Sequence, residues 1–173
     1  LATNGAGIIH DWELAWLGGT SEDVRANIER GEFGMWQETG YWINLAINVG
    51  AWRGLGYGES VGSLIRDNGL EIPPPAELEA AARAASDDPD RAARAADLLA
   101  VCRRFRLEPG WHAVEHRWAE VSVAAAAVRL GVAFTCHPMF GHDIIYAHPM
   151  NQGAAIGRTA ERDFLRFAES IGG

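Results

Sequence analysis

The first twenty residues, LATNGAGIIHDWELAWLGGT, constrain the fold more than any other stretch of the chain. Residues 1–3 are typical of the end of a buried strand, residues 4–7 form a glycine-rich turn, and residues 8–17 carry apolar side chains at helical spacing. A strand, a glycine turn and a helix start are the parts with which α/β proteins present backbone N–H groups to an anionic ligand. The turn lacks a full G-x-G-x-x-G, so a plain connection between strand and helix is an equally good interpretation.

Most of the remaining chain carries helix signals, and one short run reads as a strand. We expect helices over residues 21–30, 33–49, 59–67, 76–86, 90–106, 114–130 and 159–171. The glycine-dense residues 50–58 predict a loop, and the apolar run 132–135 predicts a parallel strand buried on both faces. The succession of helix, glycine, strand, loop and helix predicts a single α/β domain over residues 1–173 with a parallel sheet.

Composition narrows the possible partners. The net charge of -8 argues against a nucleic-acid partner, and it suits a cationic small molecule or simply serves solubility. The longest apolar run, residues 121–134, contains Arg129 and is too short to span a membrane. Cys102 and Cys136 lack metal-ligand spacing, which favours a reducing cytoplasm. All 15 basic residues are arginine, so this stretch has no lysine amine to form a Schiff base.

The sequence His112-Ala-Val-Glu115-His116 matches the H-x-x-E-H pattern of a class of zinc peptidases. On a helix the two imidazoles would share a face, and Glu115 could activate a water molecule on a bound zinc ion. A pattern with three determined positions also arises by chance, and polar side chains are common at a helix start. The zinc hydrolase is therefore one of the alternatives and not the main prediction.

A denser group of polar residues follows the expected strand at 132–135. It contains His137, His142, Asp143 and His148, and it lies where ligands bind in open parallel sheets, beside the first glycine turn if the two strands are neighbours. An aspartate there can hold a cationic amine, and a histidine can exchange a proton near neutral pH. The alternative is that the histidines are exposed loop residues and Asp143 caps a turn.

Three segments resemble deoxyhypusine synthase and, more closely, its bacterial deoxyhypusine-synthase-like relatives. They are TNGAGIIHD at residues 3–11, GEF at 31–33 and GHDIIYAH at 141–148. The resemblance spans most of the chain except residues 73–110, which look like a helical insertion or lid. It implies a Rossmann-like three-layer fold with a parallel sheet, of which this chain is a partial domain, an internal portion of a cytoplasmic subunit that assembles into a homotetramer.

The resemblance also implies an activity. In this family NAD accepts hydride from a polyamine such as spermidine, and an aminoalkyl group then passes through an enzyme lysine, here expected beyond residue 173, to an acceptor amine. The resemblance places NAD at Thr3, Asn4, Gly5, Ala6 and Gly7. It places the amine at Asp143, with His142 and His148 as further substrate-binding residues.

The catalytic residues expected from this resemblance are His10 and Asp143. His10 stands where the family has a glutamate, so it is the candidate base, and Pro138 stands where the family has a second substrate aspartate. Both differences remove negative charge from a site that binds a polycation. A protein that binds NAD or an amine without transfer chemistry is therefore the first alternative to a deoxyhypusine- or homospermidine-synthase-like transferase.

Overall fold

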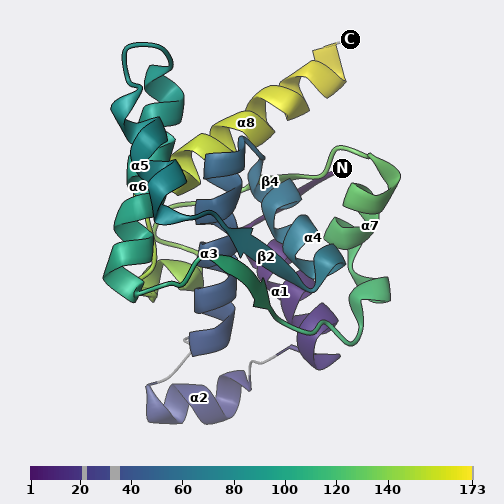
Figure 1. Ribbon diagram of the computed structural model, residues 1–173. Helices are drawn as coiled ribbons and strands as arrows, with labels where there is room; N and C mark the ends of the chain where they lie inside the picture. Colours follow the sequence, from purple (N-terminus) through teal and green to yellow (C-terminus); the bar gives the residue numbers. More distant parts are fainter. Residues whose placement is uncertain (21–22, 32–35, 173) are drawn as a thin grey trace.

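A computed structural model describes residues 1–20, 23–31 and 36–172, and most of them are helical (Figure 1). A long helix, α3, runs through the middle, and the other helices pack around it together with two short ribbons of strands. The elements in chain order are β1 (Ala2–Asn4), α1 (Gly5–Leu17), α2 (Val24–Arg30), α3 (Gln37–Arg53), α4 (Tyr57–Asp67), β2 (Gly69–Ile72), α5 (Pro75–Arg83), α6 (Pro89–Phe105), β3 (Gly110–Ala113), η1 (Ala119–Val121), α7 (Val123–Leu130), β4 (Thr135–His137), η2 (Ile144–Ala147) and α8 (Gly153–Gly172).

The three-layer Rossmann-like fold with a parallel sheet is wrong. The described strands form two separate pairs: β1 lies parallel to β4, and β2 lies antiparallel to β3. The edge of β4 shows why the parallel pair does not grow. Thr135 donates its N–H to Leu1 at 2.9 Å, toward β1, whereas the next N–H, of Cys136, points away and is bound by the Asp163 carboxylate at 2.7 Å. Helix α8 therefore takes the place that a third strand would need.

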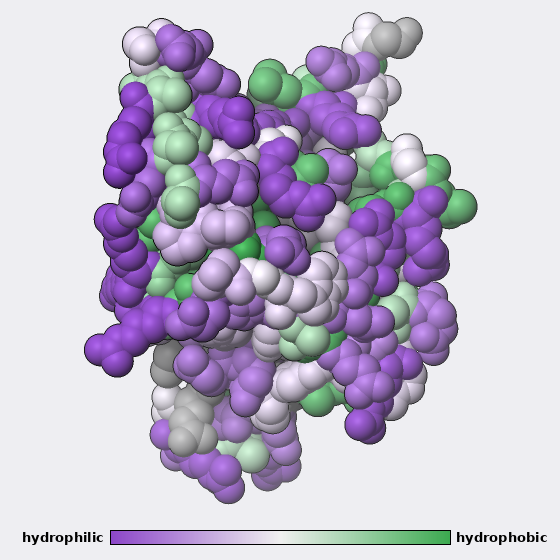
Figure 2. Space-filling view, in the orientation of Figure 1, coloured by the Kyte–Doolittle hydropathy of each residue, from purple (hydrophilic) through white to green (hydrophobic). Residues whose placement is uncertain are grey.

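The core is built from helix faces. Helix α4 packs on α3 and α7, and α3 is buried along most of its length. The largest fully buried side chains are Trp12, Tyr57, Ile8, Ile43, Leu45, Ile47, Leu64, Ile65, Ile72, Leu78, Leu98 and Ile145. The face of the molecule shown in Figure 2 is largely hydrophilic. The apolar run 132–135 that suggested a strand buried on both faces is not fully buried: Val132 is exposed, and only Thr135 of it lies in β4.

The loop predicted for residues 50–58 is also wrong. Helix α3 continues to Arg53, and α4 already begins at Tyr57. Gly50 lies where α3 crosses α4, and a side chain there would overlap the Ser60 hydroxyl group. The glycines of this stretch serve close helix packing as well as the turn, which a composition argument does not distinguish.

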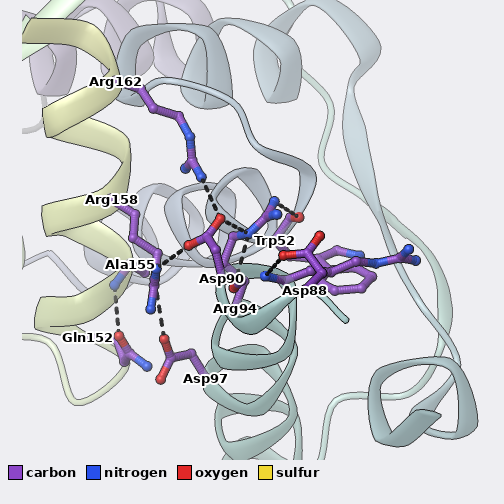
Figure 3. Close-up of polar contacts among 10 residues, drawn as sticks. Trp52, Asp88, Asp90, Arg94, Asp97, Gln152, Ala155, Arg158 and Arg162 are labelled. Atoms are coloured by element: carbon purple, nitrogen blue, oxygen red, sulfur yellow. Dashed lines mark hydrogen bonds and ion pairs between the residues drawn. The ribbon is translucent and has the colours of Figure 1, made fainter. Parts of the chain in front are cut away.

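Residues 73–110 form a helical hairpin that joins the core and α8. The break expected at 87–89 is confirmed, and Leu78 of α5 and Leu98 of α6 are buried. At the surface the Asp90 carboxylate forms ion pairs with Arg158 at 2.6 Å and with Arg94 at 2.9 Å (Figure 3). This ion-pair group fastens the start of α6 to α8.

Other boundaries differ from the expectation. The helix predicted over 114–130 is confirmed only over its last part, as α7. Just before the predicted range, residues 110–113 form β3, which pairs with the unpredicted strand β2. Helix α8 begins before residue 159, and the hydroxyl group of Thr159 bonds back to the carbonyl of Ala155 instead of capping the helix. The predicted start of the second helix at 21–22, the GEF segment and the predicted start of the third helix at 33 lie wholly or largely outside the described residues. No helix in the described parts of the chain is both long and apolar enough to cross a membrane.

The buried carboxylate of Asp163 gives a first prediction. Its side chain is 3% exposed and accepts hydrogen bonds from Gly58 at 2.9 Å and Cys136 at 2.7 Å, and burial outweighs these bonds and raises its pKa to about 6. A carboxyl group with a raised folded-state pKa stabilises the fold below about pH 4, and this contribution is lost as the pH rises through 6. Relative to the wild type, we expect Asp163→Asn to gain about 2–3 kcal/mol of unfolding free energy between pH 4 and pH 7.5.

Urea unfolding of both proteins at the two pH values measures this difference. Glu161→Gln, an exposed substitution on the same helix, serves as the control and is expected to change little. The same difference between wild type and Asp163→Asn at both pH values would contradict the prediction, whatever its size.

Candidate functional site

The candidate site lies where the ends of β1 and β4 meet. Asn4 and His137 are opposite each other in the parallel register, so the chain leaves both strands at the same edge. After Asn4 it enters α1, and after His137 it enters the loop that carries Asp143. The two polar segments expected to be neighbours are therefore side by side, although no larger sheet surrounds them.

The glycine turn expected at residues 4–7 is instead the cap and first turn of α1, and Asp143 lies directly against it. A side chain at Gly5 would overlap all three carboxylate atoms of Asp143, and one at Gly7 would overlap the hydroxyl group of Thr3. Asn4 caps α1, because its side-chain oxygen accepts the N–H of Gly7 at 2.9 Å. Small residues are needed in this turn because the protein's own polar groups approach the backbone closely.

Aromatic rings accompany the Asp143 carboxylate. The half-buried side chain accepts the N–H of Met139 at 3.1 Å. Burial raises the pKa of Tyr146 and the negative charge of Asp143 raises it further, so the tyrosine stays protonated near the carboxylate. The Tyr146 ring is stacked on Phe140, with 5.1 Å between the ring centroids. A carboxylate beside an aromatic pair is the chemistry that binds a cationic amine.

Two buried asparagines of α3 hold this segment in place. The side-chain amide of Asn44 donates to the carbonyl of Ile145 at 2.9 Å, and that of Asn48 donates to the carbonyl of Met150 at 3.4 Å. The sequence analysis did not identify either residue. Their signal is visible, because two asparagines four residues apart in an otherwise apolar helix indicate buried polar contacts.

His148 is part of the same support. Its Nδ1 accepts the N–H of Met150 at 3.1 Å, so the neutral ring carries its proton on Nε2, which lies 3.1 Å from the Gln37 amide. The Gln37 atom at this distance is Nε2, also a donor, so we assign the amide in its flipped orientation, in which the Gln37 oxygen accepts the Nε2–H of His148. Burial lowers the pKa of His148 and keeps the ring neutral. The ring also lines a cavity of about 190 Å³ between α3 and η2. Its two hydrogen-bonding contacts hold the segment that follows Asp143 against α3.

The other two candidate histidines make no described side-chain contact with Asp143. His10 is on an exposed side of α1, with its Nδ1 3.4 Å from the Thr20 hydroxyl and 3.8 Å from the Glu13 carboxylate. It follows Gly5 by more than one helical turn. His142 precedes Asp143 in the chain, and it is exposed in the loop. The structure brings Gly5 and Asp143 into contact and shows no such contact for either histidine.

In this arrangement the protein's own polar groups crowd the residues expected to bind the pyrophosphate of NAD. Of the residues expected to bind NAD, Gly5 faces Asp143, Gly7 faces Thr3, and Asn4 already binds an N–H of the turn. The positive end of α1 therefore has a carboxylate beside it, which stabilises the helix and repels a phosphate group. Ala6 is exposed.

The zinc pattern is not on a helix, so that part of the expectation is wrong. His112 lies on β3 with its Nε2 2.7 Å from the Glu108 carbonyl, and His116 follows in a loop, buried with its ring edge toward Trp12. Glu115 is exposed. In the described ranges no three His, Cys, Asp or Glu side chains are placed to hold a metal ion. The geometry gives the zinc hydrolase no support.

The contact between Gly5 and Asp143 predicts a coupled pair of substitutions. Gly5→Ala forces the carboxylate away from the turn, and we expect it to lower the free energy of unfolding by about 1–3 kcal/mol. In an Asp143→Ala background the same change meets no carboxylate, so we expect it to be neutral or stabilising by up to about 1 kcal/mol. Urea unfolding of the four proteins gives the coupling energy, and additive effects would show that the two residues are not in contact.

His116 predicts acid sensitivity. Its ring is buried beside the backbone of Val114, and burial outweighs this contact and lowers the pKa to about 4. The unfolded chain gains a proton below about pH 6.5 while the folded ring stays neutral, so stability present at pH 7 is lost as the pH falls toward 4. Urea unfolding at pH 7 and at pH 4.5 measures the loss of unfolding free energy between these pH values. We expect this loss to be about 2–3 kcal/mol smaller in His116→Phe than in the wild type. His112→Phe, on half-exposed β3, is the control, and an unchanged pH dependence in His116→Phe would refute the assignment.

Comparison with known proteins identifies no relative of this chain. No family model matches the chain, and neither a curated protein nor a solved structure is significantly similar to it. The support for a function therefore comes from the arrangement around Asp143.

Proposed function

We propose that this protein binds a cationic organic amine of the polyamine class at Asp143. The observation that carries the proposal is the Asp143 carboxylate, held against Gly5 at the shared edge of β1 and β4 and accompanied by Tyr146 and Phe140. An ammonium group would donate to the carboxylate, and the aliphatic chain of the amine would lie along the rings.

Charge favours a cation at this position. Among the described residues, no arginine or histidine forms an ion pair with Asp143. A half-buried carboxylate without a cationic neighbour gains most from a ligand that brings the positive charge. The net charge of -8 also raises the local concentration of polyamines at the surface.

The residues of the site have distinct parts in this binding. Asp143 supplies the charge, and Met139 orients the carboxylate through its N–H. Tyr146 remains a protonated hydroxyl group beside the carboxylate. His148 stays neutral and keeps the segment against α3 through Met150 and Gln37, without adding positive charge that would repel the amine.

The meeting of the two family-like segments favours a second candidate. It is the NAD-dependent aminoalkyl transferase of the deoxyhypusine-synthase or homospermidine-synthase type, with NAD at residues 3–7 and His10 as the base. When bound, NAD would supply the hydride acceptor. The closed contact between Gly5 and Asp143 places this candidate second.

Two further parts of the proposal concern the setting of the protein. We place it in the cytoplasm, which agrees with the buried free thiols of Cys102 and Cys136. The homotetramer is part of the transferase candidate, and exposed apolar side chains on and beside α7, such as Val123 and Leu130, are surfaces that such an assembly could cover.

Spermidine binding tests the proposal. Removing the charge in Asp143→Asn is expected to weaken spermidine binding by roughly 10- to 100-fold, the range for a charge-assisted hydrogen bond. Isothermal titration calorimetry of the wild type and the variant measures this change. Asp87→Asn, an exposed substitution in the turn before α6, is the matched control and is expected to bind as the wild type does.

Equal affinities of wild type and Asp143→Asn would contradict an amine site at Asp143. The transferase candidate is separated by adding NAD, because only a transferase forms NADH when spermidine is present. NADH absorbance that rises in the wild type and not in Asp143→Asn would favour the transferase over simple binding.

A further inference from the structure

A larger cavity lies on another part of the molecule. It measures about 470 Å³, is bordered by α3, α4, β2 and the start of α5, and shares no lining residue with the Asp143 site. Cavities of this size accommodate small organic molecules. In Figure 2 the surface over β2 and β3 is mixed, with hydrophilic and intermediate residues next to one another.

The β2–β3 ribbon presents two unlike side chains to this cavity. Glu71 and Trp111 are directly opposite in the antiparallel register, so they are on the same face of the ribbon. Leu70 and Ile72 alternate with Glu71 and are buried on the other face. The strand pleat therefore places the carboxylate and the indole ring on one face, and both line the cavity together with Leu70.

The indole ring of Trp111 is available to a ligand. It is 54% exposed, and it packs across the strand pair on Gly69, where a side chain would meet its ring atoms. The second tryptophan of the lining, Trp52, already carries the Arg91 guanidinium group 5.4 Å from its ring centroid. Trp111 is thus an aromatic face without a cation of the protein's own among the described contacts.

The charged side chains of the lining are mainly acidic. They are Asp67, Glu71, Glu77 and Arg53. Asp67 is bound at both carboxylate oxygens by Arg66, at 2.6 and 2.7 Å. In the part of the chain that the structure describes, Glu71 and Glu77 form no ion pair. Two carboxylates without a paired cation therefore face one arginine across the cavity.

A hydroxyl group adds an independent polar contact. Ser63 of α4 is only 9% exposed and lines the cavity, and its side chain has no hydrogen-bond partner among the described residues. The neighbouring Ser60 differs, because its hydroxyl group donates to the Gly56 carbonyl of its own helix. The Ser63 hydroxyl group therefore stays open to a hydrogen bond from water or from a ligand in the cavity.

We propose that this cavity binds a small organic ammonium ion, separately from any ligand at Asp143. The Glu71 carboxylate supplies the charge, the Trp111 ring supplies the cation–π face, and the Ser63 hydroxyl accepts a hydrogen bond from an N–H of a primary ammonium group. A quaternary ammonium ion uses the first two contacts only, and a diamine uses all three.

Nuclear magnetic resonance of the tryptophan indole N–H groups tests the proposal at the cavity itself. Choline chloride and putrescine dihydrochloride are titrated into the 15N-labelled protein, with sodium chloride at matched ionic strength as the reference. The Trp111 signal is assigned by its loss in Trp111→Phe. We expect both amines to shift this signal, and Glu71→Gln to weaken the response at least 10-fold, whereas the exposed substitution Glu161→Gln leaves it unchanged.

Three results would overturn the proposal. They are no shift of the Trp111 signal with either amine, an equal response in Glu71→Gln, or an equal response to sodium acetate, which would indicate an anion at Arg53. Ser63→Ala is expected to weaken putrescine more than choline, and equal effects on both would remove Ser63 from the site. Because Asp143 has no tryptophan among its described contacts, failure at this cavity is distinct from failure of amine binding at Asp143.

Discussion

The hydrogen bonds from two backbone N–H groups to the buried Asp163 carboxylate determine how the chain is arranged around the site. One comes from Gly58, in the first turn of α4, and the other from Cys136, on the open edge of β4. The carboxylate thus joins α8, α4 and β4 at a single point. It binds an N–H of the first turn of α4 and occupies the open edge of β4, from which the loop to Asp143 departs. Burial opposes the ionisation of this carboxylate.

Local chemistry accounts for the parts of the fold that the sequence predicted. Helices end at Gly18, Gly31, Asn68 and Gly131 because these residues adopt the left-handed conformation that closes a helix, and this preference is visible in sequence alone. The break before α6 follows from an aspartate cap and a proline. Such signals require no knowledge of a distant partner.

The sheet could not be predicted in the same way. Strand β3 contains Trp111 and His112, and it forms because β2 offers a partner more than thirty residues earlier. The apolar run 132–135 looked like an inner strand, but only its last residue lies in β4, and the outer edge of β4 is bound by an α8 side chain. Apolar runs such as residues 121–134 predict burial, and they do not determine whether a strand or a helix provides the cover.

For the site, sequence reasoning identified the Asp143 carboxylate and the glycine turn, because each follows a strand. It did not identify Asn44 and Asn48, although their spacing in an apolar helix marks them as buried. Which carbonyls they bind, and that Tyr146 stacks on Phe140, depends on the packing of the loop and was not predictable. The physics of the glycine turn explains the remaining difference. A helix N-terminus with small residues attracts an anion, and here the anion is the protein's own Asp143 rather than a phosphate. Once that carboxylate is in place, the ligand that the turn favours has the opposite charge.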